Sequence, residues 1–215
     1  MSRTEAGPGR GVLRRLVRSQ RGVALTEFAF ALPIFVTLLF GGLEIINLVM
    51  THMRINQIAI TVADNAGRVR QGIDEADIYE VFAGADLVGG SDFAQNGRVI
   101  LSSLEPNEQT GGNSGQMINW QRCHGSLSVT PRYGVQGAGR DDASLSKGLG
   151  PTGGKIKAAD GTAVMFVEVS YRYTPKILPS MVANAMDLRY ESAFNVRERT
   201  NQDISNAQNL TVQSC

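Results

Sequence analysis

A long apolar segment near the start of the chain is the strongest pattern in the sequence. Between Val23 and Met50 the only ionisable residues are Glu27 and Glu44, and the 16 residues of Phe28–Leu43 carry no charge. Together with its ends, this segment is long enough to cross a hydrocarbon core of about 30 Å as a helix. A water-soluble domain rarely contains so continuous an apolar run. The pattern therefore predicts a transmembrane helix over residues 23–50.

The helical pattern continues beyond this segment but becomes amphipathic. Apolar residues recur at spacings of three and four, at Ile55, Ile58, Ala59, Val62, Ala66 and Val69. Such a stripe packs one face of a helix against a sheet. We therefore expect the helix to continue over residues 51–71 and to end near Gly72. A second, shorter helix is expected over residues 74–85, with Asp74 as its N-cap.

The remainder of the chain contains four strand-like segments, which lie at residues 98–104, 116–123, 164–173 and 188–197. Turn residues between the first two segments fit a hairpin with a long loop. The last two alternate between an apolar and a mostly polar face, as half-buried antiparallel strands do. The predicted fold class is α+β: a long N-terminal helix whose outer half packs on a small antiparallel β-sheet, with an exported unit over residues 72–215.

One connection in this unit differs in composition from the rest. Residues 134–154 are rich in Gly, Ser and Asp. Segments of this kind bury little apolar surface. We expect a mobile surface loop.

Positive charge is concentrated before the apolar segment. Residues 1–22 contain six arginines and one glutamate, a net charge of +5, whereas the whole chain sums to +1. A basic excess before a span predicts a cytoplasmic N-terminus and a C-terminus on the other side of the membrane. An ordinary secretory signal would have a shorter apolar core and a small-residue cleavage site after it. The apolar run here ends in Gly41-Gly42-Leu43-Glu44 instead, so we expect the chain to stay attached through this helix.

The two cysteines, Cys123 and Cys215, both fall on the predicted outer side of the membrane. In an oxidising compartment such a pair is typical of a disulfide, which here would tether the C-terminal tail to the sheet. Two unrelated thiols are the alternative, because spacing alone does not show that the Cα atoms come within reach.

Catalytic and metal-binding patterns are weak in this chain. The two histidines, His52 and His124, are far apart, and Cys123-His124 without a second ligand pair makes a poor metal site. Residues 142–146 fit the D-x-S-x-S pattern of metal-dependent adhesion sites, but no hydrophobic strand precedes them, so we interpret them as a polar loop. Basic residues outside the leader are not clustered, which gives no basis for nucleic-acid binding. We expect no metal, no cofactor and no enzymatic activity.

Residues 14–50 resemble the start of TadE-like proteins of the tight-adherence (Tad/Flp) branch of type IV pilus systems. The shared pattern is a basic leader, a glycine, four further residues, a glutamate, an aromatic residue and an apolar helix. Gly22, Glu27 and Phe28 match it, and Pro33 and Glu44 are also similar to the family. The strand at 164–173 with the proline that follows it, and the closing segment 192–197, are similar to the family's C-terminal part.

The resemblance implies a pilin-like fold and a role as a pseudopilin or minor pilin in the bacterial inner membrane, with possible incorporation into a surface pilus. A prepilin peptidase would cleave between Gly22 and Val23. Glu27 and Phe28 would then contribute to subunit pairing, with Glu27 meeting the new amine of Val23 on a neighbouring subunit. The implied partners are other pilins and pseudopilins of the same pilus, the inner-membrane assembly platform and membrane lipid.

Two other functions remain open from the residues alone. In a plain signal-anchored periplasmic binding or sensor domain, Arg21-Gly22 would simply flank the anchor and Glu27 would lie among lipid headgroups. In an exported enzyme, the domain would carry a catalytic site, although no constellation of residues supports one.

Overall fold

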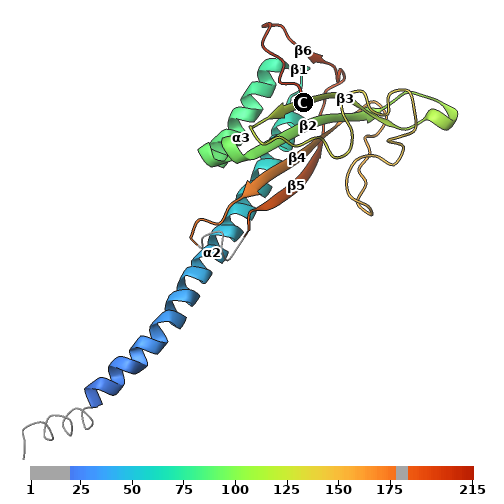
Figure 1. Cartoon of the computed structure of the whole chain (residues 1–215). Coiled ribbons are helices and arrows are strands. Elements are labelled where there is room, and N and C mark those ends of the chain that lie inside the picture. The colour runs from blue at the N-terminus through green and yellow to red at the C-terminus, as the bar shows by residue number, and fades with distance from the viewer. Residues whose placement is uncertain (1–19, 178–183) are drawn as a thin grey trace, which may run out of the picture.

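A single long helix organises the structure (Figure 1). The computed structural model describes residues 20–177 and 184–215, with side chains from Gly22 onwards; most of the basic leader lies outside this part of the chain. Helix α2 runs from Gln20 to Arg68 and continues through Pro33. Its 49 residues correspond to about 73 Å at 1.5 Å per residue. It ends three residues before the predicted end at residue 71.

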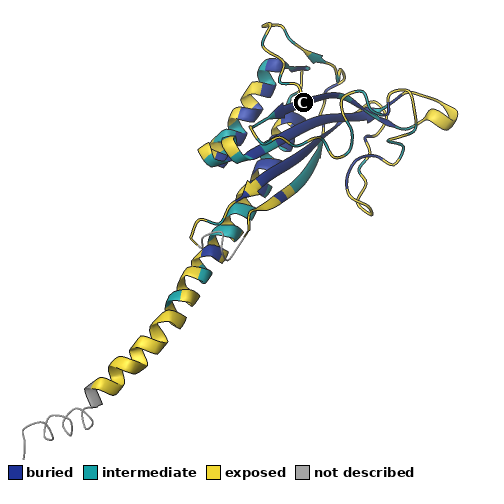
Figure 2. Cartoon of the chain, viewed as in Figure 1, coloured by how far each residue is buried: buried dark blue, intermediate teal, exposed yellow. Residues whose placement is uncertain are grey.

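The two halves of α2 have different surroundings (Figure 2). The half that precedes Glu44 protrudes from the rest of the molecule and is mostly exposed. In the outer half, the apolar stripe is buried, and its members are Ile55, Ile58, Ala59, Val62, Ala63 and Ala66. Small and β-branched residues on this stripe let the helix lie close to the sheet, as the amphipathic pattern predicts.

Helix α3 (Glu75–Asn96) packs beside the outer half of α2. Asp74 caps its start, and the Asp77 carboxylate accepts from the Asp74 amide in return, which completes a capping box. The prediction that this helix ends at residue 85 is wrong by 11 residues. Gly90, with φ of 69°, kinks the helix without ending the element. Gly89 lies directly against the Phe93 side chain, where a Cβ atom would be 2.5 Å away, so Gly89 serves close packing, whereas a Cβ atom at Gly90 would meet nothing within 4 Å and Gly90 serves the positive φ.

The four strands form one antiparallel sheet in the order β3-β2-β4-β5. Their bounds are Gly97–Pro106 (β2), Gln116–His124 (β3), Val164–Tyr173 (β4) and Met186–Asn195 (β5). The predicted α+β class, with a long helix on a small antiparallel sheet, is confirmed. The last strand begins and ends two residues earlier than predicted. Two short segments, β1 (Ile73–Asp74) and β6 (Ile204–Ser205), form a separate parallel pair.

Both faces of the sheet are covered. One face packs against α2 and α3, through side chains such as Leu101 and Val167. The other face packs against the connection between β3 and β4, through a smaller cluster that includes Phe166 and Leu149. The prediction that the second face of β4 meets solvent is therefore wrong, because Phe166, Glu168 and Ser170 are all buried there.

The connection predicted to be a mobile surface loop is packed onto this second face. Gly139 and Gly148, with φ of 77° and 82°, lie very close to other backbone segments of the protein. A Cβ atom would be 2.2 Å from the Gln116 carbonyl oxygen at Gly139 and 2.0 Å from the Ile156 carbonyl oxygen at Gly148. These glycines permit an approach that other residues would block. Leu145 and Leu149 from the same connection contribute to the smaller cluster.

Candidate functional site

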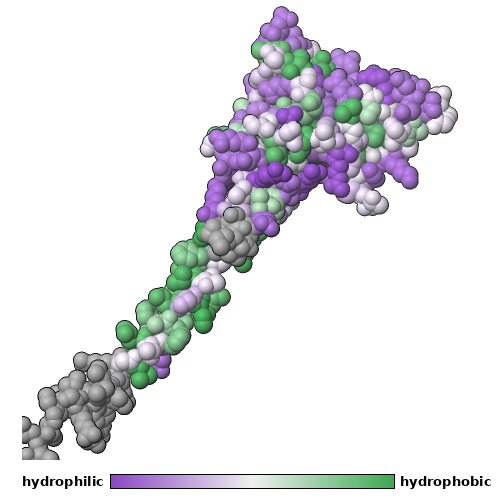
Figure 3. Space-filling model, viewed as in Figure 1, coloured by the Kyte–Doolittle hydropathy of each residue, from purple (hydrophilic) through white to green (hydrophobic). Residues whose placement is uncertain are grey.

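The protruding half of α2 is a continuous apolar surface (Figure 3). Its exposed large side chains are Val23, Leu25, Phe28, Phe30, Leu32, Ile34, Phe35, Leu38, Leu39, Phe40 and Leu43. The mean hydropathy of its most apolar window is 2.1, and the helix is long and apolar enough to cross a membrane. Exposed apolar area of this extent marks a surface that meets lipid or another protein.

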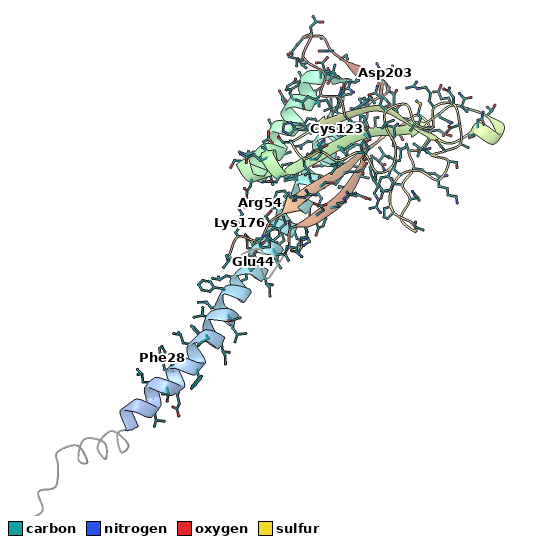
Figure 4. The ribbon with its side chains drawn as sticks, viewed as in Figure 1. Phe28, Glu44, Arg54, Cys123, Lys176 and Asp203 are labelled. Carbon is teal, nitrogen blue, oxygen red and sulfur yellow. A yellow bond between two sulfur atoms is a disulfide. The ribbon has the colours of Figure 1, made fainter. Side chains whose placement is uncertain are left out.

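The four residues singled out near the start of α2 lie on its first turns and are all exposed. Val23 and Glu27 are four residues apart and therefore share one face of the helix. No hydrogen bond or ion pair joins Glu27 to another described residue. A Cβ atom on Gly22 would have nothing within 4 Å. Phe28 points away from the helix in Figure 4 and is 62% exposed.

Glu44 marks the place where α2 enters the sheet domain, and it is buried. Its carboxylate accepts hydrogen bonds from the Tyr173 hydroxyl and from the Ile177 amide, the latter at 2.8 Å. Asn47 donates to the same Tyr173 oxygen at 3.0 Å. The sequence indicated Glu44 as an ionisable residue of the apolar segment and as a residue similar to the TadE-like family, but not its partners. Tyr173 ends strand β4 and Ile177 follows it, about 130 positions after Glu44, and nothing local to Glu44 indicates them.

A second polar contact joins α2 to the sheet at His52, eight residues after Glu44. The His52 Nδ1 atom and the Tyr190 hydroxyl of β5 are 2.9 Å apart. Burial, and then the hydrogen bond with Glu44, raise the pKa of Tyr173 to about 12. These contacts fasten α2 to β4 and β5 at the edge of the domain that lies nearest the apolar surface.

Cys123 and Cys215 form a disulfide, with Cα atoms 5.0 Å apart and a sequence separation of 92. The Cys123 amide also donates to the Gln213 carbonyl at 2.8 Å. Tyr79 on α3 donates to the Thr211 carbonyl at 2.7 Å. The C-terminal tail is therefore held against β3 and α3, and the disulfide, rather than two separate thiols, tethers it to the sheet.

The other residues considered for chemistry have structural partners. His124 contacts the Asp86 carboxylate at 2.9 Å and stacks on Phe82. Asp142 accepts from the Ser144 amide at 2.8 Å, which is an Asx-turn within a polar loop. Within residues 20–177 and 184–215, no cluster of three or more His, Cys, Asp or Glu side chains is arranged to hold a metal ion.

One buried ion pair was missed by sequence reasoning. Arg122 on β3 makes a two-pronged contact with Glu75 at the start of α3, with Nε 2.8 and 3.1 Å from the carboxylate oxygens. Both side chains are almost fully buried. The two residues are 47 positions apart, so only the packing of α3 against the sheet brings them together.

A cavity of about 690 Å³ is lined in part by Asp203, which Figure 4 labels near β6. Carboxylates and amides line it, among them Glu105, Asn107 and Asp160. Burial raises the pKa of Glu105, whose carboxylate accepts from Ser103 at 2.6 Å. Asn119 also donates to Glu105, and the Asn107 side chain bonds to backbone groups that include the Gly139 carbonyl and the Gly115 amide.

Comparison with known proteins connects the first of these features to a family. No curated protein and no solved structure matched the chain. The family model described as TadE-like protein matches residues 22–64, which span the exposed half of α2 and most of the half packed on the sheet. The predicted resemblance to TadE-like proteins of Tad pilus systems is therefore confirmed over this helix.

Proposed function

We propose that the protein is a pseudopilin or minor pilin that acts in the assembly of a Tad-type pilus. The observation that carries the proposal is the TadE-like match, which begins at residue 22 and covers an exposed apolar helix fused to a compact domain. Residues 1–22 are the leader, 23–50 the membrane-spanning part, 51–71 the amphipathic continuation and 72–215 the exported part. The protein crosses the bacterial inner membrane once, with its N-terminus in the cytoplasm and its domain in the periplasm.

A prepilin peptidase cleaves after Gly22 in this proposal and creates an α-amino group at Val23. Glu27 of a neighbouring subunit pairs with that amine when helices gather into a bundle, while Phe28 packs between the helices. An unpaired charge in such a low-dielectric bundle costs several kcal/mol, so pairing sets the axial register between subunits. The partners are the peptidase, other pilins and pseudopilins, the inner-membrane assembly platform and membrane lipid.

The N-terminal mass of the protein extracted from piliated cells tests the cleavage step. We expect a chain that starts at Val23. Gly22→Ala leaves the chain at full length. Gly41→Ala is the matched control, because a Cβ atom at Gly41 also meets nothing within 4 Å and lies far from the cut. Normal piliation with an uncut chain would favour the signal-anchored binding or sensor domain instead.

The pairing step is tested by Glu27→Ala in the same cells. Breaking a buried charge pair costs roughly 3–5 kcal/mol, so the variant is processed but enters sheared pili at least about tenfold less. Thr37→Ala is the matched control, since the Thr37 hydroxyl bonds to the Pro33 carbonyl of its own helix at 2.8 Å. Equal amounts of wild-type and Glu27→Ala protein in the pili would refute the pairing.

A further inference from the structure

A small pocket lies between α2, α3 and the end of β4, close to where α2 leaves the domain. Its volume is about 60 Å³, room for one small polar group. Asn47, Thr51 and Arg54 line it from one face of α2, at helical positions i, i+4 and i+7, and Tyr171 and Lys176 line it from β4 and the segment that follows. Figure 4 labels Lys176 above Glu44 and Arg54 slightly higher again.

The pocket carries an excess of positive charge. Lys176 forms an ion pair with Asp92 of α3, which leaves Arg54 as the uncompensated charge. Arg54 is exposed, and it makes no hydrogen bond or ion pair to another residue of the described chain. A planar guanidinium matches the oxygens of a phosphate in two-pronged geometry.

Tyr171 supplies an unused hydroxyl inside the pocket. Its side chain is 7% exposed and stacks on Phe93. Among the described residues, no group forms a hydrogen bond with this hydroxyl, and its oxygen is not one of the fully buried polar atoms without a partner, so the hydroxyl is open to the pocket or to solvent. Burial raises the pKa of Tyr171, and its nearest charges are Asp92, Lys176 and Arg54. The hydroxyl therefore remains protonated and can donate, and Tyr171 lines the same pocket as Arg54 and Lys176.

The position of the pocket fits the outer headgroup layer of a membrane. If hydrocarbon covers the exposed helix from Val23 to Leu43, about 30 Å, Asn47 lies about 6 Å, Thr51 about 12 Å and Arg54 about 16 Å beyond its edge. The headgroups add about 5–8 Å on each side, so the backbone of Asn47 is at their height and that of Arg54 lies above them. Side chains of a helix lean toward its N-terminus, which is the membrane side here, so Arg54 reaches down toward the headgroups. The apolar side chains of Ile46 and Met50, both mostly exposed, lie beside and below the pocket.

We propose that this pocket binds the phosphate of an anionic phospholipid headgroup, with Arg54 and Lys176 contacting the phosphate oxygens and the Tyr171 hydroxyl donating to one of them. The adjoining Ile46 and Met50 favour a lipid over free phosphate, because they offer apolar surface to its acyl chains. The inference rests on the membrane anchoring in the proposed function. Binding of the headgroup in this pocket fixes the height of the domain above the bilayer before assembly.

The test uses the full chain purified in detergent and titrated with phosphatidylglycerol, with phosphatidylcholine or with inorganic phosphate, and counts bound molecules by native mass spectrometry. We expect one tightly held phosphatidylglycerol. The double variant Arg54→Gln with Lys176→Gln binds phosphatidylglycerol about 30-fold more weakly, because each basic residue near an anionic headgroup contributes about 1 kcal/mol. The control, Arg70→Gln with Lys147→Gln, removes two equally exposed charges elsewhere and leaves binding unchanged.

Tyr171→Phe separates binding from folding. It removes only a hydroxyl that has no protein partner, so the variant keeps its thermal unfolding midpoint and loses several-fold in phosphatidylglycerol affinity. Equal lipid binding by all variants, or equal affinity for phosphatidylcholine, would overturn the proposal. Equal affinity for inorganic phosphate would overturn a lipid as the source. A chain that is not cleaved after Gly22 gives the same lipid titration, so failure of the processing step is recognised separately.

Discussion

The disulfide between Cys123 and Cys215 is expected to be a major source of stability. It closes a loop of 92 residues. A cross-link of that length removes chain entropy from the unfolded state worth about 4.6 kcal/mol at 25 °C in the loop-closure model. For a chain of this size, that loss lowers the unfolding midpoint by about 10–15 °C.

The perturbation is Cys123→Ala with Cys215→Ala in the full chain, followed by thermal unfolding in detergent monitored by circular dichroism. Wild-type protein treated with a reductant should unfold at the same lowered temperature as the double variant. The reductant should not change the double variant further, which makes that sample the control. Alkylation before reduction should add no mass to wild-type protein, and alkylation after reduction should modify two thiols.

The contradicting result is a double variant that lies within about 1 kcal/mol of wild type. The tail has other attachments, because the Asp74 carboxylate accepts from Ser205 at 2.7 Å and from the Ala207 amide at 2.9 Å. Retained stability would mean that these contacts hold the tail in both states and that the unfolded chain gains little freedom on reduction.

Two further predictions concern buried charges in the sheet domain. Arg122→Met leaves Glu75 buried without its partner and should lower the free energy of unfolding by about 3–5 kcal/mol. Adding Glu75→Leu to this variant should recover most of the lost stability. Denaturant unfolding of the single and double variants measures both effects, and an equal loss in the two would contradict the ion-pair explanation. Burial raises the pKa of Glu168 to about 7, so the folded state holds a proton that the unfolded state releases above about 4.5. Stability from this group is present at low pH and is lost as pH rises through about 7, by up to about 3 kcal/mol. In thermal unfolding, Glu168→Gln should remove this loss of stability between pH 5 and pH 8. A variant with the same pH dependence of the unfolding midpoint as wild type would refute the role of Glu168.

The fold was predictable where the pattern of residues is governed by one buried face. The stripe that includes Ile58 and Val62 has a helical period, and both side chains are fully buried on the sheet side of α2. The alternation along 164–173 gave the correct strand for the same reason. Asp74 was recognisable as a cap because a carboxylate at that position satisfies free amides at the helix start.

Long-range packing was not predictable from these local patterns. Polar residues such as Glu168 and Ser170 have the period of an exposed strand face, yet both are buried, and the Glu168 carboxylate accepts from the Arg132 amide in the connection between β3 and β4. The local sequence of 134–154 indicates flexibility, and only the close backbone contacts at Gly139 show that the segment is packed. Burial of Glu168 therefore depends on a partner segment that its own neighbours do not specify.

In the candidate site, too, the residues of a local motif were predictable and the long-range contacts were not. Gly22 and Glu27 are recognisable because a family motif is local and contiguous. Two contacts join α2 to the end of β4 or to the segment after it: Glu44 with Tyr173, and the grouping of Arg54 with Lys176. Sequence spacing carries no information about such pairs until the register of α2 on the sheet is known.

The attachment of Glu44 to the domain bears on the depth of Glu27 in the proposed membrane arrangement. A folded domain with polar loops does not enter hydrocarbon, so the outer boundary of the bilayer lies at or before Glu44. Counting back about 30 Å from Leu43 at 1.5 Å per residue places the inner boundary near Val23. Glu27 then lies one turn, about 6 Å, inside that boundary. At this depth, the nearest positive charge that a second copy of the chain supplies is the amine of its cleaved Val23. The amine meets Glu27 when the neighbouring helix is displaced by one turn along the axis. The contact between Glu44 and the domain therefore favours pairing of Glu27 with an adjacent subunit over solvation of Glu27 among headgroups.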